Sequence, residues 1–244
     1  MKLRSSRLRA GFVAALLFTL VPIGPTMSPA HGRTSVASAG AVASPFSPRA
    51  AERARQKEAV LRRLVEGGGG TYIGDMLADR DSALARWPDR HGKPLTVWIQ
   101  RAAELSGWSD SYLDGVRTAV HEWDALDLPV RFAFVADSAR ADVHVTFIDH
   151  FDEPISGRTK WARDDSWWIT DADITLAVHH RTGSPLDDDS MHAMALHEFG
   201  HLLGLDHTED VTSIMAPKVR VRTLSSADRA TVRLLYTLPP GGVR

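Results

Sequence analysis

Cysteine is absent from this 244-residue chain. Disulfide bonds therefore cannot stabilise the fold, and stability must come from a packed core together with any metal that the chain binds. An excess of charge is absent too, because 29 basic residues stand against 30 acidic ones. The formal net charge of −1 gives no electrostatic basis for binding nucleic acid or an anionic membrane surface. The chain also lacks internal repeats, and its composition is ordinary for a globular protein.

Acidic residues are missing from residues 1–30, which carry four basic ones. A basic start, the short apolar run 11–24 and the small residues 28–30 follow in the order typical of a secretory signal peptide. The apolar run meets Pro22 and Pro25 and is shorter than the roughly 20 residues of a membrane span, which favours export over anchoring. Removal of the four basic residues takes the formal net charge from −1 to −5. We expect a secreted (extracellular or periplasmic) monomer without an integral membrane span.

A second region, residues 31–86, precedes the part of the chain with a domain-like pattern. Residues 31–48 are small and polar and contain proline, which is typical of a disordered linker. Residues 49–66 are rich in Ala, Arg and Glu and are predicted to be helical, and the glycines at 67–70 end that helix. We favour a flexible joint there over a phosphate-binding loop, since no Lys-Ser/Thr pair follows. The sequence thus predicts a linker with a helical pro-region or N-terminal extension, followed by one domain over 87–244.

Apolar spacing within 87–244 predicts alternating strands and helices. The predicted strands are 94–100, 130–136, 141–149, 157–163 and 171–179, and the predicted helices are 109–126, one preceded by acids at 187–189, and 224–236. Ser109 or Asp110 can cap the first helix, and the acids at 187–189 suit the positive end of the second helix dipole. The basic strand 157–163 is predicted at a sheet edge. This order indicates an α+β domain of the broader α/β class, with helices packed on a mixed sheet.

The stretch HEFGHLLGLDH, residues 197–207, indicates a metal site. His197 and His201 lie one helical turn apart on the same face, so each can offer a nitrogen to one zinc ion at about 2.0–2.1 Å. Glu198 lies on the adjacent side of the helix, within reach of a metal-bound water. Gly204 tolerates positive φ, so the helix can end there and the chain can turn back to bring in His207 as a third ligand. Three protein ligands leave a fourth position open, as in a catalytic zinc site.

This stretch resembles the extended zinc motif of the metzincin metalloproteases. Met215, within SIMAP, stands where that clan has its Met-turn. The resemblance runs from about residue 87 to 236 and is strongest to the matrixin (matrix-metalloprotease-like) branch. Three further features resemble that branch: the strand ADVHVTF, Thr208 where matrixins commonly have serine, and Asp228 in the C-terminal helix.

The resemblance implies a zincin-like fold, with three main helices on a mixed, twisted five-stranded sheet and a Met-turn after the active-site helix. It also implies a secreted zinc metalloendopeptidase with one catalytic Zn²⁺ that acts on protein or peptide substrates. Zinc lowers the pKa of a bound water from about 15.7 toward 7. Glu198 accepts the proton of that water as general base and passes it to the departing amine. Met215 forms an apolar floor beneath the metal.

Substrate binding is implied at the edge strand, where a peptide adds as an antiparallel strand. The residues expected to bind substrate are Arg158, Thr159, Lys160, Trp161, Pro217 and Val219. Val219 stands where matrixins usually have a tyrosine that lines the specificity pocket, which leaves the shape of that pocket open.

The chain departs from the matrixin pattern in two other ways. Matrixin propeptides usually block the zinc with a cysteine, so any inhibition by residues 31–86 must work differently. A loop that holds structural Ca²⁺ or a second Zn²⁺ is also hard to identify. His144, Asp149, His150 and Asp152 are available as ligands, but we favour solvated loop residues. Exposed or capping roles are likewise favoured for His179, His180 and His192.

Two other classes of function stay open from the sequence. One is an exported zinc hydrolase of a non-protein amide, such as one in a cell wall. The other is a domain that binds zinc and peptide without cleaving, against which the presence of Glu198 argues. The natural substrate and the mature N-terminus do not follow from the residues.

Overall fold

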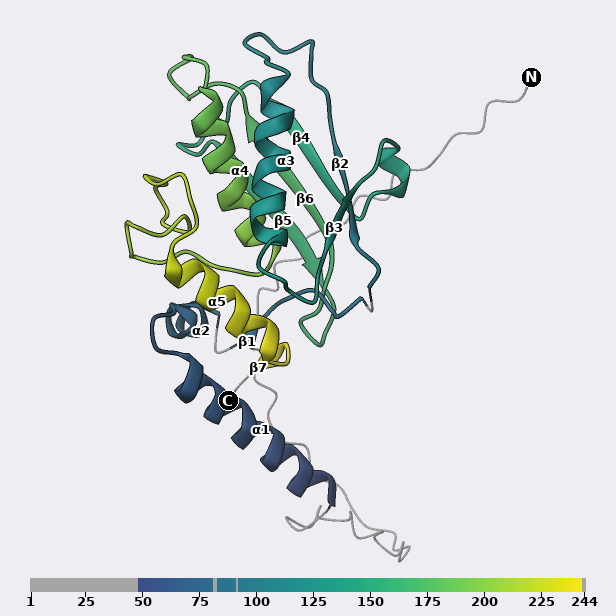
Figure 1. The fold of residues 1–244 in the computed structure, drawn as a ribbon, viewed down its shortest axis with the longest axis vertical. Helices are drawn as coiled ribbons and strands as arrows, with labels where there is room; N and C mark the ends of the chain where they lie inside the picture. The colour runs from purple at the N-terminus through teal and green to yellow at the C-terminus, as the bar shows by residue number, and fades with distance from the viewer. Residues whose placement is uncertain (1–47, 81–82, 91, 243–244) are drawn as a thin grey trace, which may run out of the picture. The chain divides into compact units, whose positions relative to one another are not determined.

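A computed structural model describes residues 48–80, 83–90 and 92–242 (Figure 1). The predicted signal peptide, residues 1–30, and most of the predicted linker lie outside the described residues. Within the described ranges, no helix has both the length and the hydropathy that crossing a membrane requires.

A five-stranded mixed sheet forms the centre of the fold, in the strand order β3-β2-β4-β6-β5. β2 pairs in parallel with β3 and β4, β4 pairs in parallel with β6, and β5 is antiparallel to β6. These strands are β2 (Leu95–Ile99), β3 (Phe132–Phe134), β4 (Val143–Ile148), β5 (Gly157–Arg163) and β6 (Ile169–Ala177); a separate pair joins β1 (Ala83–Leu84) to β7 (Gly241–Gly242). The predicted fold class, the five-stranded sheet and the edge position of β5 are confirmed.

Helices α3 and α4 lie side by side against the sheet, and α5 lies near α2 (Figure 1). The helices are α1 (Pro48–Gly67), α2 (Ile73–Asp79), α3 (Ser111–Asp124), α4 (Asp188–Leu202) and α5 (Ser226–Thr237), with a short 3-10 helix at Ser138–Arg140. α3, α4 and α5 are the three helices predicted within residues 87–244. α1 confirms the helix predicted over 49–66, whereas α2 was not predicted.

The core lies between the sheet and the pair α3 and α4. β4 buries Val143, Val145 and Phe147, which confirms the alternation predicted for this strand. Trp123 of α3 is fully buried, and its indole Nε1 donates a hydrogen bond of 2.9 Å to the carbonyl of Leu196 in α4. The core therefore fixes α4, which carries the histidine motif.

One local prediction was wrong and another was confirmed in part. The strand predicted over 130–136 is reduced to β3, an edge strand in which Phe134 is 36% exposed. Of the two caps predicted for α3, Ser109 accepts a hydrogen bond from the backbone N–H of Ser111 at 3.3 Å, whereas Asp110 precedes the helix without capping it. Its carboxylate instead accepts hydrogen bonds from the Arg101 guanidinium, at 2.8 and 3.0 Å.

Residues 72–86 pack closely against the domain that follows them. Tyr72 and Met76 are buried, and the backbone N–H of Tyr72 donates to the hydroxyl of Thr231 in α5 at 3.1 Å. The Arg86 guanidinium lies between the rings of Trp168 and Tyr236, at 4.7 and 5.4 Å from their centroids. The role of residues 31–86 as a pro-region or extension stays a prediction.

Candidate metal centre and catalytic cleft

The ends of α4 place the histidine motif. Asp187 caps the start, where its carboxylate accepts a hydrogen bond from the backbone N–H of Ser190 at 2.6 Å. The helix ends at Leu202, and Gly204 adopts φ = +100°. A Cβ at Gly204 would also lie 2.2 Å from the carbonyl oxygen of Ala85, so both the backbone angle and the space require glycine. The predicted reversal of the chain at Gly204 is confirmed.

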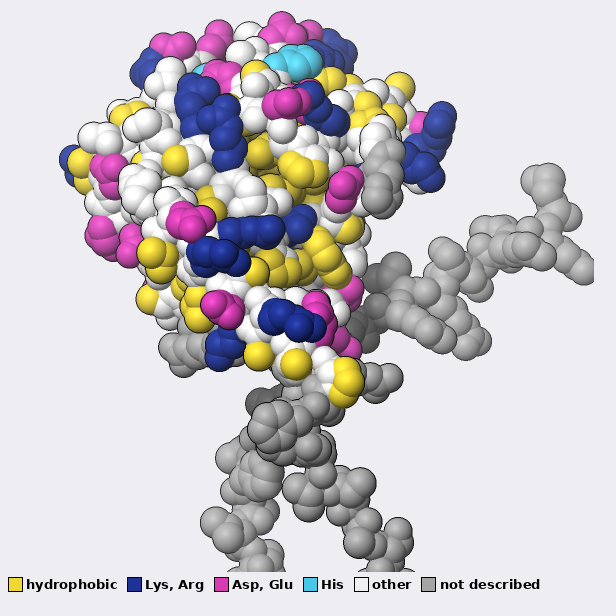
Figure 2. Space-filling view, turned by 60° about the horizontal axis from the view of Figure 1, so that its bottom comes forward, with side chains coloured by type: hydrophobic (Ala, Val, Ile, Leu, Met, Phe, Trp, Pro, Cys, Tyr) yellow, Lys and Arg dark blue, Asp and Glu magenta, His cyan; other side chains and the backbone are white. Residues whose placement is uncertain are grey.

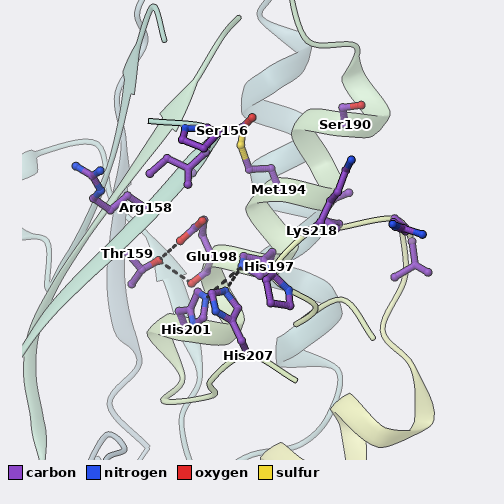
Figure 3. A pocket seen from close by; sticks show the side chains of 18 of the residues that line it. Ser156, Arg158, Thr159, Ser190, Met194, His197, Glu198, His201, His207 and Lys218 are labelled. Atoms are coloured by element: carbon purple, nitrogen blue, oxygen red, sulfur yellow. Dashed lines mark hydrogen bonds between the residues drawn. The ribbon is translucent and has the colours of Figure 1, made fainter. Parts of the chain in front are cut away.

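The three histidines of the motif converge on one point (Figure 3). The Nε2 atom of His201 lies 3.1 Å from Nε2 of His197 and 3.2 Å from Nε2 of His207, and the third separation is 3.4 Å. Tetrahedral coordination with metal–nitrogen distances of about 2.0–2.1 Å requires nitrogen separations of about 3.3 Å. The observed separations therefore fit a single zinc-sized cation.

Two of the imidazoles are held in the tautomer that binds metal. His197 Nδ1 donates to the carbonyl of Ile214 at 2.7 Å, and His201 Nδ1 donates to the carbonyl of Leu205 at 3.0 Å. Since a carbonyl oxygen only accepts, both Nδ1 atoms carry the proton and both Nε2 atoms offer a lone pair. Burial lowers the pKa of His197 to about 4 and the pKa of His201 to about 3, which keeps both rings neutral at neutral pH.

Glu198 lies beside this triad, with its carboxylate directed toward β5 (Figure 3). The Thr159 hydroxyl lies 2.6 Å from Glu198 Oε2 and 3.0 Å from the Glu198 carbonyl oxygen, and it donates to these acceptors. Burial raises the pKa of Glu198 to about 7, against the opposing effects of the Thr159 hydrogen bond and the Arg158 charge. A buried carboxyl group whose pKa is near neutral suits proton transfer.

The segment around Met215 packs against α4 and contacts the first histidine of the motif through the Ile214 carbonyl. Met215 is fully buried, its carbonyl accepts from the Thr208 N–H at 3.1 Å, and its sulfur packs against α4 at Gly200. Asp228 in α5 supports this segment, because its buried carboxylate accepts from the Ile214 N–H at 3.1 Å and from the Ser213 hydroxyl.

All residues predicted to bind substrate line one cleft of about 960 Å³, which also contains the three convergent histidines and Glu198. Arg158, Thr159, Lys160 and Trp161 belong to β5 on one side, and Pro217 and Val219 follow the Met215 segment on the other. Within the described chain, β5 pairs with β6 alone, so its other edge is free.

Comparison with known proteins places this arrangement in a family. The chain matches the family Matrixin over residues 87–237, which is more than half of its length. The chain belongs to the matrixin family. Three relatives are matrix metalloproteinase-15 of Homo sapiens, metalloendoproteinase 1-MMP of Arabidopsis thaliana and metalloendoproteinase 1 of Glycine max.

These matrixins are related to the chain at low identity. The human protein is 27% identical over 187 residues, which is 64% of this chain and 26% of that protein. The Arabidopsis protein is 31% identical over 174 residues, 60% of this chain and 45% of that protein. The Glycine max protein is 34% identical over 97 residues, 38% of this chain and 30% of that protein. The chain thus spans less than half the length of each of these relatives.

Other histidines of this matrixin do not join a second ligand cluster in the part of the chain that the structure describes. His144 Nε2 lies 2.9 Å from the carbonyl oxygen of Ser138, whereas His150 pairs with Asp149. His192 Nε2 lies 2.9 Å from a carboxylate oxygen of Glu122, as a structural residue would. His180 is exposed, as predicted, and it also lines the cleft.

Sequence reasoning missed several residues of the cleft. Arg80 lies between the glycines at 67–70 and the domain predicted from residue 87, and no motif in the neighbouring sequence marks it. It nevertheless forms an ion pair of 2.5 Å with Asp206, next to His207. Sequence reasoning also missed Lys218, Arg220 and Arg222, although their alternation with Val219 and Val221 is a pattern that could have indicated an exposed row of cations.

Proposed function

We propose that this matrixin-family chain is a secreted zinc-dependent endopeptidase. One observation carries the proposal: a buried glutamate stands beside three convergent imidazole Nε2 atoms, in a cleft bordered by the free edge of a β-strand. Family membership supports it, as do relatives named metalloproteinase and metalloendoproteinase.

The proposed chemistry assigns one role to each group. His197, His201 and His207 would hold Zn²⁺, which supplies an activated water and polarises the scissile carbonyl. Glu198 would accept the proton of that water and pass it to the departing amine. The Thr159 hydroxyl orients the Glu198 carboxylate through the 2.6 Å hydrogen bond. The apolar floor at Met215 takes no part in the chemistry.

Substrate would bind along β5. Its free edge offers backbone N–H and C=O groups to an antiparallel peptide strand, in the mode known as β-augmentation. Residues 158–161 would flank that peptide on one side, and Pro217 and Val219 would shape the pocket on the other.

Export and a monomeric state belong to the same proposal. The basic, apolar and small-residue order of residues 1–30 supports cleavage of a signal peptide. N-terminal sequencing of exported protein is expected to find a start after residue 30, and a start at Met1 would contradict export by this route.

Peptide cleavage tests the proposed activity. The processed protein is expected to cleave casein or a quenched peptide, and a zinc chelator should abolish that cleavage. The Glu198→Ala variant is expected to keep bound zinc while its kcat falls by about 10²- to 10⁴-fold. Zinc binding without cleavage would favour a non-cleaving domain. Chelator-sensitive hydrolysis of a cell-wall amide alone would favour the other alternative.

A further inference from the structure

The rim of the cleft is strongly basic. Six cationic side chains line it against two acidic ones, Glu198 and Asp206. The cations are Arg80, Arg158, Lys160, Lys218, Arg220 and Arg222. The chain as a whole carries a formal net charge of −1, so this excess of positive charge is local to the cleft and does not follow from composition.

Three of the six cations are neutralised by neighbouring carboxylates. Arg80 pairs with Asp206 at 2.5 Å, Arg158 pairs with Glu153 at 2.7 Å, and Arg222 pairs with Asp189.

The other three, Lys160, Lys218 and Arg220, form no ion pair with any carboxylate among the described residues. All three side chains are exposed. Their charges are therefore available to a ligand.

Two of these free cations, Lys218 and Arg220, follow the Met215 segment and stand on the wall of the cleft opposite to β5. Lys160 alternates with Thr159 in β5, so its side chain points to the face of the sheet opposite to the Thr159 hydroxyl that contacts Glu198. Figure 3 shows Lys218 on the side of the histidine triad opposite to Arg158 of β5. A peptide lying along β5 would pass between these walls.

The alternation of valines and cations after Pro217 explains why Lys218 and Arg220 face the solvent. Val219 and Val221 are partly buried and pack against the core, so the intervening cations are left outside. Lys and Arg side chains lie in several groups on the face of the molecule shown in Figure 2, with hydrophobic side chains between them. Apolar surface bordered by unpaired cations suits a partly apolar, acidic ligand.

We propose that the cleft selects peptides with aspartate or glutamate side chains near the scissile bond, which Lys218 and Arg220 recognise. The inference rests on the proposed endopeptidase function and names its substrate class. Low-dielectric walls of one charge sign focus the field in a cleft and raise the local concentration of ligands of opposite charge. The preference for acidic peptides is therefore expected mainly as a lower KM.

Two quenched peptides test the proposal, identical except that glutamates flanking the cleavage site in one are glutamines in the other. At low salt, kcat/KM is expected to be about fivefold or more higher for the glutamate peptide, through a lower KM. At about 1 M salt the Debye length shrinks to about 3 Å, and the two peptides should become equivalent.

Charge reversal separates a local effect from one of net charge. The Lys218→Glu/Arg220→Glu variant should prefer the glutamine peptide. The Arg140→Glu/Arg233→Glu variant changes net charge equally at exposed positions that do not line the cleft, and should keep the original preference. Equal cleavage of both peptides, or equal loss of preference in both variants, would overturn the acidic preference and leave the endopeptidase function standing. Cleavage of neither peptide by the zinc-loaded protein would overturn both.

Discussion

Both oxygens of the Glu198 carboxylate are positioned by β5. The Thr159 hydroxyl donates to Oε2, whereas Gly157 leaves room for Oε1. A Cβ at Gly157 would lie 2.4 Å from Oε1 and 2.8 Å from Cδ of Glu198. The strand that is proposed to bind substrate therefore also sets the position of the proposed general base.

Replacement of Gly157 is expected to impair turnover without loss of metal. In Gly157→Ala the added methyl group displaces the Glu198 carboxylate, and a displacement of about 1 Å costs on the order of 100-fold in kcat. Gly74→Ala is the matched control, because nothing lies within 4 Å of a Cβ there. Steady-state kinetics and metal analysis of both variants test this prediction. A Gly157→Ala protein with full kcat would show that Gly157 does not position the Glu198 carboxylate.

The buried histidines make a second prediction, about pH and the metal-free protein. Burial lowers the pKa values of His197 and His201 below 6.5, so the unfolded chain takes up protons first as pH falls. The contribution of these histidines to the free energy of unfolding should therefore be complete above pH 6.5 and decrease as pH falls toward about 4, whereas Glu198, whose pKa is raised to about 7, makes a smaller opposing contribution in the same range. Denaturant titrations in chelator at pH 7 and pH 5 measure this, and a His197→Gln/His201→Gln variant should show a smaller decrease. An equal decrease in both proteins would contradict the assignment of this pH dependence to His197 and His201.

Among the structural elements, the end of α2 is joined to the loop that carries the third histidine. Arg80 pairs with Asp206 and donates to the carbonyl of Gly204 at 3.2 Å, and its guanidinium lies 5.3 Å from the ring centroid of Trp161 in β5. One side chain thus ties three separate elements together beside His207.

Loss of this tie is expected to weaken metal binding. Because the loop that presents His207 would be less restrained, Arg80→Ala should lower zinc affinity by about 10- to 100-fold, as is usual for groups that orient ligands. Competition with a chromophoric chelator measures the affinity. Arg117→Ala removes an exposed arginine that pairs with Asp114 on α3 and should leave the affinity unchanged. An unaltered affinity in Arg80→Ala would mean that the loop holds its shape alone.

The elements also show what the sequence can predict. β4 and α4 follow from local periodicity because burial of one face imposes the spacing of apolar residues. The candidate metal site follows from eleven adjacent residues, since one helical turn and the reversal at Gly204 bring the three histidines together. Arg80 contacts Gly204 from 124 positions away, and such a contact leaves no pattern in the neighbouring sequence. Likewise, nothing local marks β3 as a short, exposed edge strand.

At the scale of the whole molecule, Tyr72, Met76 and Leu84 belong to the folded unit that carries the candidate site. The Tyr72 hydroxyl donates to the carboxylate of Asp228 at 3.2 Å, and Met76 and Leu84 are fully buried. The match to the matrixin family begins later, at residue 87. The family boundary and the physical boundary of the folded unit therefore differ.

Two shortened proteins test this difference. A protein beginning at residue 87 loses several buried side chains and should unfold at a temperature lower by on the order of 10 °C. One beginning at residue 71 keeps Tyr72 and Arg80 and should unfold at a higher temperature than the protein that begins at residue 87. Thermal unfolding with zinc present compares the two, and equal midpoints would show that residues 71–86 contribute nothing to stability.

The position of Asp228 bears on the order in which a growing chain acquires its activity. Synthesis adds the three histidines and Glu198 before it reaches Asp228, whose carboxylate holds the Met215 segment through Ser213 and Ile214. A nascent chain that stops before α5 would carry every group proposed for catalysis yet lack support beneath them. We therefore expect hydrolytic competence to arise only after α5 has left the ribosome, and not when the histidine motif itself emerges.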